Sequence, residues 1–204
     1  MYQNFMDKIK LSTKTIENQI KSMSLKFFSQ KDDKMEWKIK PPSFILSFYK
    51  FVYYHKRIPN QEEFWKFYYD ENKKNFTDKI IQNLKALQAR CYRAYPSIVR
   101  DIHFYYIMAE SQLFEQVFYN PKIDIKYGID FILRYKRRVY GVNCYINTVR
   151  SHKGRAKKQF RHGKVKNLIP IDLPVDFKGC KKCGQFYLYS QKELHQLKKL
   201  LDEK

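Results

Sequence analysis

Basic residues fill the interval between Asp130 and Asp172, where no Asp or Glu occurs. Such clustered ammonium and guanidinium groups bind the phosphates of nucleic acids. A solvated surface does not need this segregation of charge, so the interval predicts binding to a polyanion. The cations are Arg134, Lys136, Arg137, Arg138, Arg150, Lys153, Arg155, Lys157, Lys158, Arg161, Lys164 and Lys166.

The basic residues after position 150 also show a helical spacing. If residues 152–161 are helical, Lys153, Lys157 and Arg161 share one face. Like charges at this spacing repel by roughly a few tenths of a kcal/mol per pair, a cost that bound phosphates reverse. The alternative is a solvated basic helix. We expect nucleic-acid contacts from Arg134, Lys136, Arg137, Arg138, Arg150, Lys153, Arg155, Lys157, Lys158 and Arg161.

Asp130 is the only carboxylate in residues 126–150. It lies in the first of two segments, GIDFILRYK and VYGVNCYINT, which are rich in β-branched and aromatic residues and meet at Lys136-Arg137-Arg138. This composition predicts a tight β-hairpin. An Asp that follows a glycine can also cap a turn, and that role for Asp130 stays open.

The elements around this hairpin are predicted from periodicity and capping residues. A helix over residues 101–116 and a strand, QVFYN, precede it. The basic helix SHKGRAKKQFRH, the strands NLIPIDLP and QFYLYS, and a last helix capped by Ser190 follow it. The predicted order is αβββαβ with a further strand and helix.

The first half of the chain is predicted to be all helical. Apolar residues recur at near-helical spacing over residues 1–23, a polar connection covers 24–42, and Ser43, Asn60 and Thr77 each begin a helix. We predict a helical region over 1–97 and an α/β core over 98–204. The two helices joined at RIPN form either a helix-turn-helix reader or a bundle with an aromatic core.

This order of elements resembles the PD-(D/E)xK superfamily, which has the restriction-endonuclease-like fold. In particular, Gly128-Ile129-Asp130 stands at the start of the second strand of a hairpin-like meander. The resemblance covers roughly residues 98–203. It implies an α+β protein with a mixed sheet. In that family, an Asp, a Glu on the preceding helix and a D/E-x-K triplet on the next strand hold Mg²⁺ and activate a water molecule.

Residue by residue, the resemblance implies Asp130 as the Asp and Glu110 or Glu115 as the helical Glu. Strand alternation puts Asn143 and Tyr145 on the face shared with Asp130, so Asn143-Cys144-Tyr145 takes the place of the triplet. An amide is a weaker metal ligand than a carboxylate, and a Tyr with a pKa of about 10 does not replace an ammonium group at pH 7.

Residues elsewhere in the chain could supply the two missing groups of the site. Lys153 or Lys157 would supply the ammonium group, and Asp124 the missing carboxylate. An active enzyme would then use Mg²⁺ with Asp130, Glu110, Glu115, Asn143 and Lys153. Otherwise the fold has kept its nucleic-acid surface and lost its chemistry.

Cys180 and Cys183, in CKKC, form half of a zinc site. No second CxxC occurs, so we expect a basic turn between strands and no zinc. The four cysteines are too scattered for a disulfide framework, which favours a reducing cytoplasm.

Composition narrows the partner. A formal charge of +21 over 204 residues points to a polyanion, and no apolar stretch is long enough to span a membrane. The leading hypothesis is a nucleic-acid-binding protein on a degenerate nuclease-like fold, with DNA favoured over RNA, acting in a larger nucleoprotein, defence or mobile-element complex. The alternatives are an active Mg²⁺-dependent nuclease and a basic protein that binds an acidic protein partner.

Overall fold

The structure is a computed structural model that describes residues 4–28, 31–146, 165 and 167–204. It is an α+β protein with a four-stranded mixed sheet and a separate two-stranded sheet. The α+β class and the mixed sheet predicted from the sequence are confirmed. The basic residues expected to form a helix over 152–161 lie outside the described residues.

The first half of the chain is helical, as predicted. Its elements are η1 (Phe5–Lys8), α1 (Thr13–Ile20), the single-turn π-helix η2 (Lys34–Lys38), α2 (Phe44–His55), α3 (Gln61–Asn72), η3 (Lys73–Asn75) and α4 (Asp78–Ile81). Ser43 caps α2 by accepting a hydrogen bond from the Leu46 amide. Asn60 caps α3, and Glu63 completes a capping box with it.

Helices α2 and α3 form an antiparallel pair. Ser47 near the start of α2 bonds Glu71 near the end of α3, whereas Phe51 contacts Phe67 further along. The aromatic side chains between the helices are core residues. These contacts place the two helices antiparallel, with aromatic side chains packed between them.

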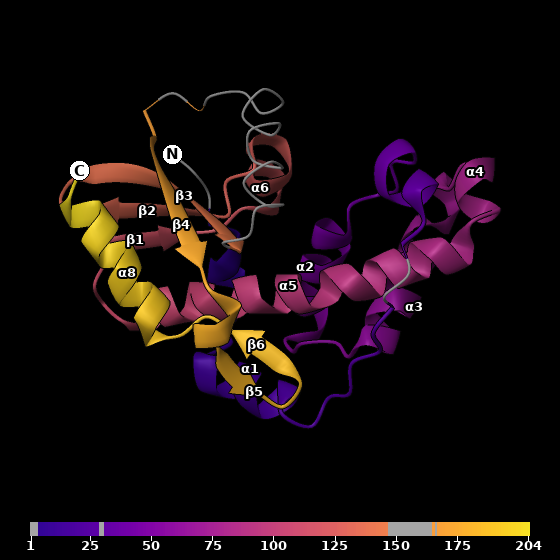
Figure 1. The fold of residues 1–204 in the computed structure, drawn as a ribbon, viewed down its shortest axis with the longest axis horizontal. Coiled ribbons are helices and arrows are strands. Elements are labelled where there is room, and N and C mark those ends of the chain that lie inside the picture. The colour runs from indigo at the N-terminus through magenta and orange to yellow at the C-terminus, as the bar shows by residue number, and fades with distance from the viewer. Residues whose placement is uncertain (1–3, 29–30, 147–164, 166) are drawn as a thin grey trace.

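One helix, α5 (Leu84–Glu110), joins the two halves of the chain over 27 residues (Figure 1). The sequence predicted a helix from Thr77 through Tyr95 and another over 101–116. Instead, the helix is interrupted between α4 and α5, and α5 then continues without interruption past Pro96. The boundary expected after residue 97 therefore lies inside this helix.

Pro96 is compatible with an unbroken α5 because another residue replaces its missing hydrogen bond. Proline has no N–H to donate to the carbonyl four residues earlier, which belongs to Tyr92. The buried side chain of Gln61, at the start of α3, donates to that carbonyl at 3.0 Å instead. The same side chain accepts a hydrogen bond from the Lys26 amide at 2.6 Å. Gln61 thereby holds α3 and the first connection against the middle of α5.

The four-stranded sheet consists of β1 (Gln116–Phe118), β2 (Phe131–Tyr135), β3 (Arg138–Ile146) and β4 (Ile169–Val175), in that spatial order. The first three strands are antiparallel, and β4 runs parallel to β3. The predicted β2–β3 hairpin is confirmed. The prediction of three directly successive strands was wrong, because α6 (Pro121–Tyr127) lies between β1 and β2.

Local sequence explains α6. Asn120 caps it, Pro121 occupies its first turn, and Gly128 ends it in the left-handed conformation at φ 65°. A capping Asn followed by Pro is typical of a helix start, so the sequence itself carries the signal for α6.

The chain ends with η4 (Phe177–Gly179), a short hairpin of β5 (Lys181–Cys183) and β6 (Phe186–Leu188), and α8 (Gln191–Asp202). Ser190 caps α8 as predicted, with Glu193 in a capping box. Helix α8 and the C-terminal half of α5 lie beside the four-stranded sheet, and α1 lies with β5 and β6 (Figure 1). The N-terminal segment thus packs against the C-terminal part of the chain.

A buried histidine joins these distant segments. His103 on α5 contacts Glu17 on α1, with Nε2 to Oε1 at 2.9 Å, and Lys181 on β5 bonds both oxygens of Glu17. Burial alone would raise the pKa of Glu17, but the Lys181 and His103 hydrogen bonds lower it. Burial lowers the pKa of His103 below its ordinary value, although Glu17 acts in the opposite direction. His103 is therefore a buried core histidine with a carboxylate partner.

The Gln61 contact predicts a coupling with Pro96. Gln61→Ala leaves the Tyr92 carbonyl and the Lys26 amide without their partner and should lower the free energy of unfolding by about 1–3 kcal/mol. In a Pro96→Ala background the new residue 96 amide can bond the Tyr92 carbonyl, so Gln61→Ala should cost less. Urea denaturation of the four proteins measures this coupling. Exposed Gln82→Ala is the control, and equal costs in both backgrounds would contradict the interpretation.

Burial of His103 predicts a pH dependence of stability. The unfolded chain binds a proton near pH 6.5 more readily than the folded one, so stability is present above that pH and is lost as pH falls toward 5. His103→Gln should flatten the dependence between pH 7 and 5, measured by urea denaturation at each pH. His195→Gln, on the exposed side of α8, should leave the curve unchanged. An unchanged curve for His103→Gln would show that other groups control it.

Candidate functional site

Asp130 lies against β3, directly before β2. Its backbone N–H donates to the Val142 carbonyl at 3.0 Å, and its Oδ2 accepts a hydrogen bond from the Cys144 amide at 2.6 Å. The structure therefore brings Asp130 together with the Asn143–Tyr145 stretch, as the predicted hairpin requires. This hydrogen bond joins Asp130 to β3 and braces the hairpin, which is a structural role different from the turn cap considered in the sequence analysis.

Asn143 faces a carboxylate that the sequence analysis did not consider. Asn143 on β3 and Asp172 on β4 are register partners, and the Asn143 Nδ2 donates to the Asp172 Oδ1 at 3.3 Å. The buried Asn143 Oδ1 has no hydrogen-bond partner among the described residues. A signal for Asp172 existed in the sequence, because it occupies the polar phase of the otherwise apolar strand IPIDLP.

Helix α5 contributes Asp101 to the same region. Burial raises the pKa of the Cys144 thiol, and the nearby carboxylates of Asp130 and Asp101 raise it further. The same two carboxylates raise the pKa of Tyr189, which is also buried. Asp101 lies one helical turn before Phe104, whose ring contacts Phe131 at 5.9 Å. Asp101 on α5 thus lies near Cys144 and Tyr189, the two side chains that Asp130 also influences, whereas the sequence analysis placed it on a helix but not in the site.

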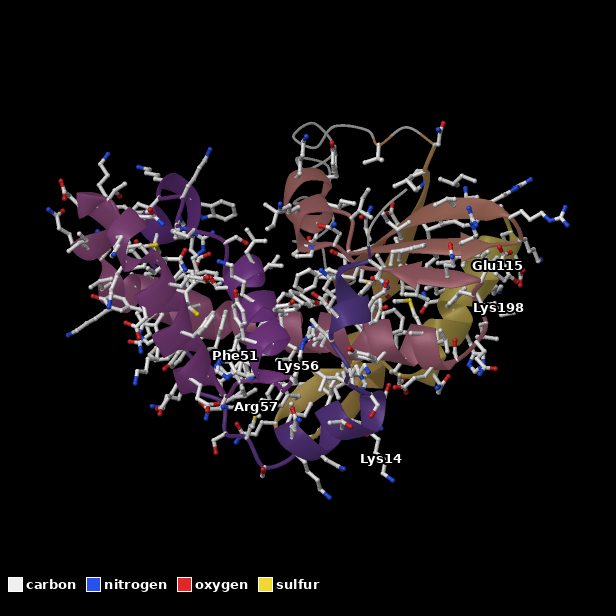
Figure 2. All side chains as sticks on the ribbon, turned by 180° about the vertical axis from the view of Figure 1, so that it is seen from behind. Lys14, Phe51, Lys56, Arg57, Glu115 and Lys198 are labelled. Carbon is white, nitrogen blue, oxygen red and sulfur yellow. The ribbon has the colours of Figure 1, made fainter. Side chains whose placement is uncertain are left out.

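Glu110 and Glu115 lie elsewhere. Glu110, the last residue of α5, accepts a hydrogen bond from the Thr13 amide at 2.8 Å at the start of α1. Glu115 accepts one from the Arg137 amide at 2.9 Å in the hairpin turn. Glu115 precedes β1 and lies beside the Tyr135 end of β2, whereas Asp130 precedes the other end, so the two are about 17 Å apart at about 3.3 Å per residue. Figure 2 shows Glu115 at the edge of the molecule near Lys198 on α8. Neither glutamate is placed to share a metal ion with Asp130.

The hairpin turn is basic and tied to α8. Lys136 and Arg137 both have positive φ, 48° and 62°, as a two-residue turn between antiparallel strands requires. Lys136 pairs with Asp202 at 2.7 Å, and the Arg138 guanidinium donates to the Lys204 carbonyl at 2.7 Å. Hydrogen bonds, first from Lys136, hold the pKa of Asp202 well below its usual range.

The hairpin cations accordingly differ in their availability. Lys136 and Arg138 are partly engaged with the end of α8, whereas Arg134 projects from β2 with an exposed side chain. Six of the expected contact residues, among them the candidate catalytic residue Lys153, lie outside the described part of the chain: Arg150, Lys153, Arg155, Lys157, Lys158 and Arg161.

Cys180 and Cys183 make separate contacts. The Cys180 Sγ lies 3.6 Å from the Asp176 carbonyl, and the Cys183 Sγ lies 3.5 Å from the Glu17 carbonyl. Burial raises the pKa of both thiols, which disfavours the thiolate form that zinc binds. Within the described residues, no three His, Cys, Asp or Glu side chains are grouped as metal ligands.

Comparisons with known protein families, with curated proteins and with solved structures find no match. Among the helices that the structure describes, none combines the length and the apolar character needed to cross a membrane. The functional interpretation therefore rests on the geometry and charge of the chain itself.

The brace formed by Asp130 predicts a loss of stability. Asp130→Ala removes the acceptor of the Cys144 amide and should lower the free energy of unfolding by about 1–3 kcal/mol, measured in urea. Asp70→Ala removes an exposed ion pair with Lys73 and should cost under about 0.5 kcal/mol. A cost for Asp130→Ala no larger than this control would show that the hydrogen bond is dispensable.

Proposed function

We propose that this protein binds nucleic acid through a nuclease-like core that has lost its own chemistry. The order of elements supports the proposal. Helix α5 precedes the antiparallel strands β1, β2 and β3, and β4 lies parallel beside β3. The described elements agree with the first helix and the four strands of the αβββαβ order implied by the PD-(D/E)xK resemblance, with α6 as an addition between β1 and β2. The second helix of that order falls between β3 and β4, largely outside the described residues.

The contacts at the Asp130 end of the hairpin carry the proposal. The place of the catalytic triplet holds Asn143, Cys144 and Tyr145, which offer neither a carboxylate nor an ammonium group. Asp130 is bonded to the Cys144 amide, and the Asn143 amide is bonded to Asp172. Groups that would bind a metal ion in an active nuclease here connect strands to one another.

Charge supports a nucleic acid as the partner. The chain carries 41 Lys and Arg against 20 Asp and Glu. Phosphate contacts by exposed cations, including Arg134 on β2, would give sequence-independent affinity that falls steeply with salt. DNA is our favoured ligand, and a partner protein in a nucleoprotein complex would supply any cleavage activity.

A second candidate function, that of an active Mg²⁺-dependent nuclease, is favoured by a different observation. The carboxylates of Asp101 and Asp130 both raise the pKa of the Cys144 thiol. Asp172 lies beside Asn143 on the neighbouring strand. These carboxylates, on α5, before β2 and on β4, are hard oxygen ligands of the kind that Mg²⁺ prefers. Lys153 or Lys157 would then have to supply the ammonium group.

One assay separates the two functions. Labelled duplex DNA, single-stranded DNA and RNA are incubated with the protein in Mg²⁺, Mn²⁺ or EDTA, and both binding and cleavage are measured. We expect binding in EDTA as strong as in Mg²⁺ at equal ionic strength, no cleavage, and a steep loss of affinity between about 50 and 200 mM salt.

Other results have defined meanings. Metal-dependent cleavage that disappears in Asp101→Ala and Asp130→Ala, with binding retained, would establish the nuclease instead. Glu115→Ala is the control for cleavage, because Glu115 lies at the far end of β2 from Asp130 and should not take part in metal binding there. Absence of binding to all three nucleic acids, with retention on heparin, would reject the proposal in favour of an acidic protein partner.

A further inference from the structure

A pocket of about 280 Å³ lies where η1, α2 and the residue before α6 meet. Its aromatic lining comes from Phe5, Tyr53 and Tyr54, and its cations are Lys8 and Lys50. The volume is just below the range of about 300–1,000 Å³ typical of small-ligand pockets, so the pocket suits one planar group rather than an extended ligand. None of the residues considered in the sequence analysis as functional lines it.

Packing against buried residues holds the aromatic lining of the pocket in place, and one of its rings remains exposed to solvent. Phe5 packs edge-on against the buried ring of Tyr49, with centroids 5.9 Å apart. Lys56 lies over the Tyr53 ring at 4.4 Å and donates to the Lys8 carbonyl at 2.8 Å, which joins the end of α2 to η1. Tyr54, in edge contact with Tyr53, keeps 65% of its surface exposed. Its ring is the one available for stacking.

The two lysines differ in how strongly they are engaged. Among the described residues, Lys8 makes no ion pair, and its side chain is exposed. Lys50 pairs with Glu71 on α3 while 54% of its side chain remains exposed. A phosphate at the rim of the pocket would therefore meet one uncompensated ammonium group and one that is partly compensated.

The amides that line the pocket are already used within the protein. The Asn4 side chain bonds Tyr105 and the backbone of Val117 and Tyr119. The Asn120 side chain accepts a hydrogen bond from the Lys122 amide. With the Asn4 amide and the Asn120 oxygen engaged, the pocket offers an aromatic surface, positive charge and the Asn120 Nδ2 donor, which by itself does little to distinguish one base from another.

We propose that this pocket holds one unpaired nucleotide of a single-stranded nucleic acid, with its base stacked on Tyr54 and its phosphate at Lys8 and Lys50. Base stacking on an aromatic side chain beside a cationic groove tolerates any sequence, because every base has a π-face. A base paired inside a duplex cannot present that face. The inference rests on the proposed nucleic-acid binding and narrows its substrate to single strands.

The pocket is connected to the nuclease-like core through a row of rings. Phe5 contacts Tyr49, Tyr49 contacts Tyr119 at 4.5 Å, and Tyr119 contacts Phe131 at 6.1 Å. Phe131 directly follows Asp130 in the chain. A strand held in the pocket is thus bound on the same packed unit as the hairpin, at a defined place relative to it.

Binding of a fluorescent oligothymidine and of a duplex of equal length to the full chain tests the inference. Tyr54→Ala should weaken single-strand binding by about fivefold or more and leave duplex binding unchanged, whereas Tyr54→Phe should bind like the wild type. Lys8→Glu should weaken single-strand binding more than Lys14→Glu. Lys14 lies on α1, does not line the pocket and gives the same charge change (Figure 2).

Two failures can be told apart. If the wild-type chain binds the oligonucleotide but Tyr54→Ala binds it equally well, or if the two lysine variants lose affinity equally, the pocket is rejected and the proposed nucleic-acid binding stands. If the wild-type chain binds neither the single strand nor the duplex, the proposed function itself is rejected, and the pocket proposal with it. A circular dichroism spectrum of each variant verifies that it is folded.

Discussion

The burial of α5 is the constraint on which the rest of the structure depends. Every residue from Ile102 to Met108 is buried, so this part of the helix is covered on all sides, unlike an amphipathic surface helix. The four-stranded sheet and α8 cover it on one side, and the N-terminal segment covers it on another. A helix of this kind needs both ends of the chain in place before its apolar surface is removed from water. The Glu17–His103–Lys181 contact and the Gln61 hydrogen bond to Tyr92 are polar ties that fix those covering segments at defined positions along α5.

The same packing determines what the Asp130 region can do. Because α5 passes beneath the hairpin, it brings Asp101 near Cys144, while the parallel strand β4 brings Asp172 beside Asn143. Hydrogen bonds to the Cys144 amide and between Asn143 and Asp172 give these polar groups partners inside the protein. Carboxylates satisfied in this way stabilise the sheet, and the same oxygens would need to be released or shared before they could bind a metal ion. Carboxylates that bond only within the sheet would make this scaffold a binding protein, and carboxylates that bind a metal ion would make it an enzyme.

Charge and aromatic surface act at different places on the molecule. The hairpin presents Arg134, Lys136, Arg137 and Arg138 at one end of the sheet, where Glu115 and Asp202 offset part of their charge. The pocket at η1 and α2 combines Lys8 and Lys50 with the exposed ring of Tyr54. Cations alone attract any polyanion, whereas an exposed ring beside them favours unpaired bases. The two surfaces therefore supply different components of nucleic-acid affinity, one electrostatic and one that depends on the strand being single.

The sequence by itself determined the local features: the caps at Ser43, Asn60 and Ser190, the β2–β3 hairpin, the α+β class and the excess of positive charge. Each depends on neighbouring residues or on composition, so no knowledge of distant contacts was needed. Tertiary structure decided the continuity of α5 through Pro96, because the compensating donor comes from Gln61, 31 residues before the Tyr92 carbonyl that it bonds. Tertiary structure also decided which carboxylates lie near the Asp130 end of the hairpin. Glu110 bonds the start of α1 and Glu115 bonds the hairpin turn, at the end of β2 far from Asp130. Asp101 and Asp172 instead come near Cys144 and Asn143 through helix packing and parallel strand pairing, which periodicity along one chain does not specify.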